Sequence, residues 1–378
     1  MAMHKYDVIV VGLGGMGSAT VYQLAKRGKK VLGIEQFQIS HELGSSHGLS
    51  RIIRLAYHEG PQYVGFGQRA YELWRTLETE IGEKILHITG SVHAGPPDSS
   101  AFKDTLNACV DQQIPHQILN SQQLNKKFPG YQLPNEYMAV FQQDGGFLVP
   151  EKCIEGHVNV AINLGAEIHL EEQVMNWEPL QSGVKIITNR GEYESESVVF
   201  TVGAWASKML PELKGFAVPE RQVVAWFETA NKAIFDPKKF PVFIISSDSH
   251  EYYGFPIFGI PGYKVGKFHH VGEIADPDHL DRTIREEDKE MLLTFTQKHF
   301  PEAAGRMLKM VVCMFTNSPD HNFIIGQHQK YPQISYAAGF SGHGFKFCST
   351  IGEVMADLAE NRNTIHDISI FSPNRFIH

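Results

Sequence analysis

The sequence predicts an α/β protein in which a parallel nucleotide-binding sheet is interleaved with a second, mixed-sheet α+β domain. Three observations support this fold class. An apolar strand, a glycine-rich turn and an amphipathic helix follow one another within residues 6–27. A second strand, glycine turn and helix span residues 334–360 near the other end. Between them, β-rich and mixed α/β stretches alternate without an internal repeat or a low-complexity linker. Distant parts of the chain are therefore expected to share one sheet.

The first forty residues contain the most specific motif. An apolar strand, Tyr6 to Val11, runs into Gly12-x-Gly14-x-x-Gly17. The first glycine permits the tight turn, the second lets the backbone approach a pyrophosphate, and the third lets helix and strand pack closely. A helix follows, and a second apolar strand ends on Glu35, whose carboxylate can bind a ribose and would repel a 2′-phosphate. This order favours FAD or NAD over NADP.

The remaining elements follow from apolar periodicity and from glycine and proline breaks. Further helices are expected at 62–81, 151–164, 285–299 and 349–360. Further strands are expected at 86–94, 167–174, 184–188, 191–196, 198–205, 222–229, 242–246, 251–255, 263–269, 310–314 and 334–338. We assign residues 1–84, 145–219 and 322–378 to a cofactor-binding domain, and residues 85–144 and 220–321 to a substrate domain.

Composition limits the function classes. The chain has 378 residues and a formal net charge of -8, and it has no extended basic stretch that could bind nucleic acid. No apolar run approaches the roughly 20 residues of a membrane helix, and residues 1–5 are too short and polar for a signal peptide. The four cysteines show no CxxC spacing, and the 19 histidines are scattered. We expect a cytoplasmic protein with a small-molecule partner, no disulfide framework and no metal site.

Several polar residues are candidates for chemistry. Arg54 offers a planar, two-pronged donor set to a carboxylate, and Lys346 offers a point charge after the late glycine turn. Arg51 would share a helical face with Arg54 if residues 50–55 were helical. Lys264 and Cys313 are further candidates. Three of these residues also have a simpler structural interpretation: Arg54 could form a surface salt bridge, Lys264 could lie at a strand edge, and Cys313 could be an inert buried thiol.

The chain resembles the monomeric sarcosine oxidase and N-methyl-L-amino-acid oxidase family over essentially its whole length. The resemblance rests on the first glycine motif and on five more segments: 44–54 (GSSHGLSRIIR), 252–256 (YYGFP), 264–267 (KVGK), 313–320 (CMFTNSPD) and 339–346 (GFSGHGFK). It implies FAD bound covalently through a cysteine thioether. It also implies oxidation of the C–N bond of a secondary amino acid, with electrons passed to oxygen to give hydrogen peroxide.

The resemblance also assigns roles to individual residues. It implies that Cys313 carries the flavin, that Arg54 and Lys346 bind the substrate carboxylate, and that Lys264 activates oxygen. Arg51, Tyr253 and His269 join Lys264 as catalytic candidates. The implied cofactor-binding residues are Gly12, Gly14, Gly17, Glu35, Gln36, Ser45, Ser46, Arg51, Val174, Gly342, Gly344, Phe345 and Lys346.

Two departures from the family pattern bear on the substrate. Phe315 stands where the family often has tyrosine, and Phe268 stands four residues after Lys264, where the family usually has histidine. A bulge could bring His269 into that place, or the histidine role is lost. Ile244, Ile245, Phe258 and Phe315 suggest an apolar pocket.

The main hypothesis is an oxidase of an N-methyl amino acid such as sarcosine or N-methyltryptophan. It would yield an aldehyde, the demethylated amino acid and hydrogen peroxide. A competing hypothesis for the substrate is a cyclic imino acid (pipecolate or proline) or a primary amine (glycine). Two more hypotheses change the activity itself: a dehydrogenase that reduces a partner protein, and a redox-silent flavin-binding module. We expect a monomer or a weak homo-oligomer.

Overall fold

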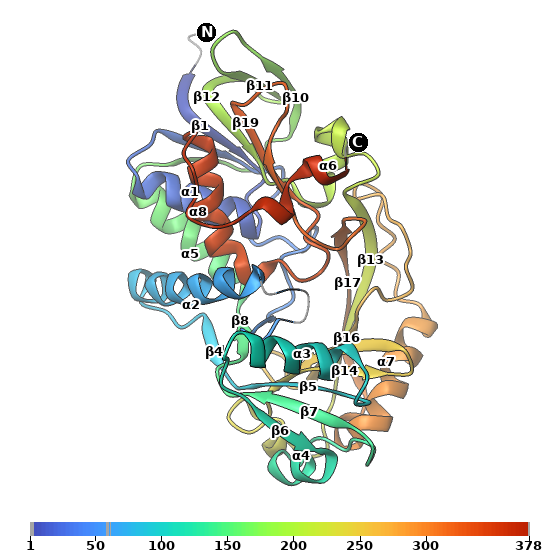
Figure 1. Cartoon of the computed structure of the whole chain (residues 1–378). Helices are drawn as coiled ribbons and strands as arrows, with labels where there is room; N and C mark the ends of the chain where they lie inside the picture. Colours follow the sequence, from blue (N-terminus) through green and yellow to red (C-terminus); the bar gives the residue numbers. More distant parts are fainter. Residues whose placement is uncertain (1–3, 58–59, 61, 377–378) are drawn as a thin grey trace.

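The computed structural model describes residues 4–57, 60 and 62–376. Their strands form two large sheets and a small one, and the two large sheets lie at opposite ends of the molecule (Figure 1). The α/β class is confirmed, with parallel pairing in one large sheet and mainly antiparallel pairing in the other.

The first sheet is built around the parallel strands β1, β2 and β12. Its order is β10-β11-β12-β1-β2-β9, with β19 also paired to β12 and β18 paired to β19. The strands are β1 (His4–Val11), β2 (Val31–Ile34), β9 (Glu167–His169), β10 (Val174–Pro179), β11 (Val184–Thr188), β12 (Glu192–Phe200), β18 (Ile324–Gln327) and β19 (Ile334–Ala338). Segments from both ends and the middle of the chain therefore share one sheet, as the sequence predicts.

Both faces of β1 are buried, which explains its unbroken apolar sequence. Val8 and Val10 pack into the core under the helices, whereas Ile9 and Val11 pack into the core on the other face. The helices of the first core are α1 (Gly15–Lys26), α2 (Gln62–Ile81), α5 (Pro150–Asn163) and α8 (Cys348–Ala359). Figure 1 shows α1, α5 and α8 stacked beside the sheet. The short helix α6 (Ala206–Met209) follows β12.

The second large sheet has the order β17-β13-β16-β15-β14-β5-β7-β6. Its strands are β5 (Ser91–Gly95), β6 (Gln117–Asn120), β7 (Met138–Gln142), β13 (Val218–Phe227), β14 (Val242–Ser247), β15 (His250–Phe255), β16 (Tyr263–Lys267) and β17 (Met307–Asn317). The helices around it are α3 (Ser100–Asp111), α4 (Ser121–Lys127) and α7 (Glu286–His299). Phe243, Phe295 and Phe300 stack in the core between this sheet and α7.

The third sheet joins β3 (Arg51–Ile53), β8 (Gly146–Leu148) and β4 (Leu86–Ile88). It takes strands from both sides of the predicted boundaries at 85 and 145, and the domain boundaries themselves stay a prediction. β3 also shows that residues 51–53 are extended. The helical face suggested for Arg51 and Arg54 is therefore wrong, because strand pairing with β8 fixes this segment instead.

Four predicted strands differ in the structure: one is divided, one is shortened and two are merged. The strand expected at 86–94 divides into β4 and β5 at Gly90, which has a φ of 81°. The strand expected at 167–174 ends at His169, and Glu171 follows with a φ of 55°. Conversely, the two strands expected at 191–196 and 198–205 are the single strand β12. Its first half pairs with β11 and its second half with β19.

The long strands β13 and β17 rise from the second sheet toward the first (Figure 1). They bring the end of β17 to the region where β1 and β12 end. No helix in the described part of the chain has the length and apolarity needed to cross a membrane.

Candidate active site

A cavity of about 330 Å³ lies at the carboxyl ends of β1, β2 and β12. This is the place where open α/β sheets bind ligands. Nearly all of the predicted cofactor-binding residues line it: Gly12, Gly14, Glu35, Gln36, Ser45, Ser46, Arg51, Val174, Gly342, Gly344 and Phe345. Gly17 and Lys346 are the two that do not.

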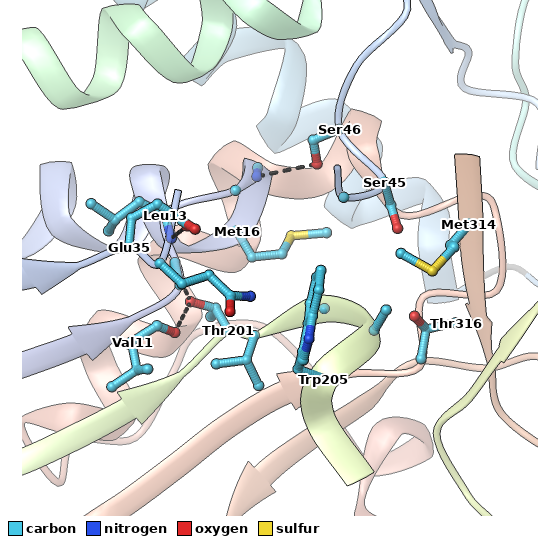
Figure 2. Close-up of a pocket in the computed structure, with 18 of the residues that line it drawn as sticks. Val11, Leu13, Met16, Glu35, Ser45, Ser46, Thr201, Trp205, Met314 and Thr316 are labelled. Atoms are coloured by element: carbon cyan, nitrogen blue, oxygen red, sulfur yellow. Dashed lines mark hydrogen bonds between the residues drawn. The ribbon is translucent and has the colours of Figure 1, made fainter. Parts of the chain in front are cut away.

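Sequence reasoning missed the third wall of this cavity. Thr201 and Trp205 line it from the end of β12, and Met314 and Thr316 line it from β17 (Figure 2). A signal for the first pair exists in the sequence, because residues 198–205 have the pattern of a buried strand that ends in a glycine turn. Carboxyl ends of parallel strands meet at one edge of the sheet, so this turn belongs beside Gly12.

The glycine turn is shaped by close packing. Gly12 has a φ of 86°, and a side-chain carbon there would come within 2.8 Å of the Thr201 carbonyl oxygen. A side-chain carbon at Gly17 would collide with the carbonyl oxygen of Gly12. At Gly14, by contrast, such an atom would meet only the Ser46 hydroxyl, at 3.7 Å. Gly17 therefore acts through packing, while Gly14 presents its backbone to the cavity.

The amino end of α1 suits a diphosphate. Gly14 precedes the helix and supplies no capping side chain, and no acidic residue lies in the first turn. The Gly15 N–H donates to the Ser46 hydroxyl at 3.3 Å (Figure 2). A helix amino end with open N–H groups and a positive dipole is a ready anion site. The residues present therefore fit the diphosphate of FAD.

Glu35 lies at the position that the sequence predicts for a ribose ligand. Its carboxylate accepts hydrogen bonds from the Leu13 N–H at 2.7 Å and the Phe37 N–H at 3.1 Å. Burial raises the pKa of this carboxyl, and the backbone hydrogen bonds act in the opposite direction. The backbone thus aims a buried carboxylate at the cavity, which suits ribose hydroxyl donors.

A second, inner pocket of about 60 Å³ adjoins the large cavity. The two share four lining residues: Arg51, Phe315, Gly342 and Phe345. The predicted residues Arg54, Tyr253, Cys313 and Lys346 line the inner pocket. Sequence reasoning missed its other members: His47, Ile52, Val224, Phe255 and His343. These residues come from β3, β13, β15 and the adjoining loops. All except Val224 lie within the family segments 44–54, 252–256 and 339–346, which gave a signal for their segments but not for these positions.

Arg54 and Lys346 meet over one tyrosine ring. The Arg54 guanidinium carbon lies 4.2 Å from the centre of the Tyr57 ring, and Lys346 Nζ lies 5.0 Å from it. Lys346 Nζ also donates to the Tyr57 hydroxyl at 3.2 Å and to the His343 carbonyl at 2.7 Å. Both cations are buried, with exposures of 2% and 6%. Two buried positive charges at one end of a small pocket have the chemistry that would suit an anion such as a carboxylate.

Arg51 stands between the cavity and the inner pocket. Its guanidinium donates to the carbonyls of Ser50 and Ser45, each at 2.9 Å. It therefore both holds the segment that carries Ser45 and places positive charge where the two cavities join.

Lys264 lies inside β16, within the strand that the sequence predicts at 263–269. It is 1% exposed, and its Nζ donates to the Gly48 carbonyl at 2.7 Å and to Ser50 at 3.0 and 3.1 Å. Burial, with the nearby charge of Arg51, holds its pKa well below the usual lysine range. It lines neither cavity. The Lys264 ammonium is therefore separated from both cavities by residues 48–50, and any effect of its charge on a bound group would be electrostatic, without direct contact.

Cys313 lies in β17 and is 4% exposed. Burial raises the pKa of its thiol, and the charges of Arg51 and Lys264 work against that rise. His47 lines the same pocket, and burial together with these two cations lowers its pKa to about 3. Burial therefore favours the neutral thiol, and the two cations limit that preference without reversing it.

The structure places Phe268, and not His269, at the pocket. Phe268 lines the inner pocket, with its ring centre 4.9 Å from that of Tyr253. β16 ends at Lys267, and His269 then adopts a φ of 51°. Its Nδ1 lies 3.4 Å from the Glu220 carboxylate, and it lines neither cavity. No bulge brings His269 into the pocket, and we leave it out of the proposed machinery.

The apolar lining agrees only in part with the sequence hypothesis. Ile244 and Phe315 line the inner pocket. Ile245 points to the opposite face of β14, into the core beneath α7. Phe258 packs on His87 and Phe147 away from the pocket. Within the described residues, no three histidine, cysteine or acidic side chains gather as a metal site requires.

The fold and the glycine turn define a dinucleotide-binding protein, and the comparisons with known proteins identify the dinucleotide. Residues 7–358 match the model of the DAO family, described as FAD dependent oxidoreductase, and the chain belongs to this family. The choice between FAD and NAD is thereby settled in favour of FAD.

Within that family the chain belongs with the monomeric sarcosine oxidases and N-methyl amino acid oxidases. It is 41% identical over 380 residues to monomeric sarcosine oxidase of Bacillus sp., covering 99% of this chain and 98% of the relative. It is 34% identical over 374 residues to N-methyl-L-tryptophan oxidase of Yersinia pestis, and the match covers 98% of this chain and 99% of the relative. Among solved structures, NikD, an unusual amino acid oxidase, matches with a TM-score of 0.85, 24% identity and 98% of each chain. L-proline dehydrogenase from P. horikoshii matches with a TM-score of 0.85, 22% identity, 99% of this chain and 98% of the other. These two likenesses concern the fold.

Proposed function

We propose that this protein oxidises a small N-methyl amino acid, of which sarcosine is the model. The products are an aldehyde, the demethylated amino acid and hydrogen peroxide. The observation that carries the proposal is the pair of buried cations, Arg54 and Lys346, at one end of an inner pocket that adjoins the FAD cavity. An amino-acid carboxylate held there places the amine toward Arg51 and the large cavity.

The size of the inner pocket supports a small substrate. Its volume is about 60 Å³, well under the roughly 150 Å³ of an engineered cavity that admits benzene. An indole ring would therefore require the wall to move, so N-methyltryptophan is the less favoured substrate. Phe268, Phe315 and Ile244 make that wall apolar, which suits an N-methyl group and a short carbon chain.

Each proposed role follows from one contact or charge. Bound FAD supplies the two-electron acceptor for the amine and the donor for oxygen. Arg54 and Lys346 bind the carboxylate, and Tyr253, which also lines the inner pocket, borders the amine. Lys264 provides a fixed buried charge that stabilises the negative charge developing on oxygen. Cys313 forms the thioether to the flavin.

A second candidate substrate is a cyclic imino acid such as proline or pipecolate. It is also a secondary amine with an adjacent carboxylate, and its compact ring suits an apolar wall made of Phe268 and Phe315. A cytoplasmic location and a monomeric or weakly associated state remain our predictions.

A peroxide assay with sarcosine, N-methyltryptophan, other N-methyl amino acids, pipecolate, proline and glycine tests the proposal. We expect the highest kcat/KM for sarcosine or another short N-methyl amino acid. Higher kcat/KM for proline or pipecolate would favour the second candidate. Preference for N-methyltryptophan would contradict the argument from pocket size, and no peroxide from any of these substrates would contradict the function.

A further inference from the structure

Arg282 joins two separate segments of the chain that line the FAD cavity. It lies between β16 and α7, where residues 268–285 form neither helix nor strand. Its Nη1 donates to the Val312 carbonyl at 2.9 Å and to the Glu42 carbonyl at 3.3 Å. Its Nη2 donates to the Leu43 carbonyl at 2.9 Å. One guanidinium therefore ties residues 42–43 to β17, one residue before Cys313.

The backbone of Arg282 is itself fixed by a buried arginine. Arg221 is 0% exposed and donates to both carboxylate oxygens of Asp288, at 3.0 and 2.8 Å. It also donates to the carbonyls of Asp281, at 3.2 Å, and Thr283, at 2.8 Å. Those two residues flank Arg282 on either side. Because the backbone on both sides of Arg282 is held, its side chain loses less conformational entropy when it forms its own hydrogen bonds.

The two tied segments form different parts of the cavity wall. Residues 42–46 lead to Ser45 and Ser46, and the Ser46 hydroxyl accepts from the amino end of α1. β17 contributes Met314, Phe315 and Thr316. Figure 2 shows Ser45 and Met314 beside the same cavity. Residues 42–46 have no helix or strand pairing, so side-chain contacts set their position.

We propose that Arg282 is a positioning residue for FAD. It fixes the position of residues 42–46, beside the diphosphate, relative to β17, which carries Cys313. Both segments can then contact the cofactor at the same time. The proposal rests on the FAD assignment of the cavity and is independent of the substrate. Loss of the guanidinium would leave the Glu42, Leu43 and Val312 carbonyls without this donor and separate the two parts of the wall.

The test measures reversible FAD binding to apoprotein carrying Cys313→Ser, by quenching of flavin fluorescence. Adding Arg282→Gln should weaken FAD binding roughly tenfold to hundredfold, the scale of charge-assisted hydrogen bonds. Arg282→Lys keeps the charge but cannot bond to all three carbonyls, so its loss of FAD affinity should be intermediate. The matched control is Arg306→Gln, an arginine just before β17 whose side chain faces Glu228. It should leave FAD affinity unchanged.

Binding of ADP separates positioning from general destabilisation. ADP occupies the nucleotide end and does not reach β17, so Arg282→Gln should weaken ADP binding less than FAD binding. Amide hydrogen exchange should rise in residues 42–46 and 312–316 and stay unchanged in β1. FAD affinity close to that of the parent, or equal losses for FAD and ADP, would overturn the proposal. Failure of the parent apoprotein to bind FAD would instead refute the cofactor assignment as well.

Discussion

The nucleotide end of the cavity and the inner pocket are built by different means. At the nucleotide end, backbone atoms make most of the site: the Gly12 turn, the Gly15 N–H and the Leu13 N–H that holds Glu35. In the inner pocket, the long side chains of Arg51, Arg54 and Lys346 line the wall, and we propose that they provide the chemistry. The first region is largely contiguous in sequence, whereas the second is gathered from distant elements.

This difference predicts two kinds of failure. Adding atoms to the nucleotide end should exclude the cofactor, because backbone segments there are in close contact. Removing charges from the inner pocket should leave the cofactor bound and impair one step of the reaction at a time.

The largest expected effect is loss of FAD from Gly17→Ala. A side-chain carbon there collides with the carbonyl of Gly12, so the turn must deform. The purified variant should be colourless, as absorbance will show. Gly65→Ala is the control, because it lies in α2 with open space around it and should retain full flavin content. Normal flavin content in Gly17→Ala would show that the turn is not a close-packed cradle.

Cys313→Ser should remove the covalent link while leaving FAD bound. After acid precipitation, the flavin of the parent should stay in the pellet and that of the variant should pass into the supernatant. Cys109 is a buried cysteine on the inner face of α3, and Cys109→Ser should behave as the parent. Complete release of flavin from the parent would contradict the thioether.

Arg54→Ala and Lys346→Ala should each weaken a simple carboxylate inhibitor by roughly 2–4 kcal/mol, because the anion loses half of its countercharge in a dry pocket. Inhibitor binding can be followed through the flavin spectrum. Flavin content should be retained in both variants. Unchanged inhibitor affinity in both would rule out the carboxylate clamp.

Lys264→Met should slow reoxidation by air a hundredfold or more, a loss of about 2.7 kcal/mol, and change anaerobic reduction by at most about tenfold. Stopped-flow absorbance measures the two half-reactions separately. Lys267→Met is the matched control, since it lies three residues further along β16, on the opposite face. A collapse of reduction with normal reoxidation would make Lys264 a substrate residue.

The smallest effect concerns pH. Burial holds the pKa of Lys264 below its usual range, so its charged form is lost at lower pH than in an ordinary lysine. Reoxidation should therefore fall as pH rises, with a midpoint below the usual value of about 10.4. The same shift means that Lys264 opposes folding, and its contribution to stability should improve as pH rises through the window between its folded and unfolded pKa values. Lys264→Met should reduce the pH dependence of both the reoxidation rate and the free energy of unfolding.

The same contrast explains how much the sequence could predict. Gly12, Gly14 and Glu35 follow one another along the chain in a fixed geometric order, so their positions in the cavity were predictable. Cys313 and Arg54 were found through family motifs, and both line the inner pocket. Their proposed roles remain predictions.

The missed residues depend on tertiary contacts. Trp205 and Met314 line the cavity only because β12 and β17 end beside it. Val224 and Phe255 lie in strands, and the sequence does not determine which face of each strand is turned toward the pocket. The position of His269 depends on where β16 ends, since a positive φ turns its side chain away from the pocket.

Anaerobic reduction by sarcosine tests the central claim most directly. The yellow protein, mixed with sarcosine under nitrogen, should lose its flavin absorbance in proportion to the amount of amine. Admission of air should restore the colour and produce hydrogen peroxide. Flavin that stays oxidised with sarcosine and with every other secondary amino acid tried would contradict the account.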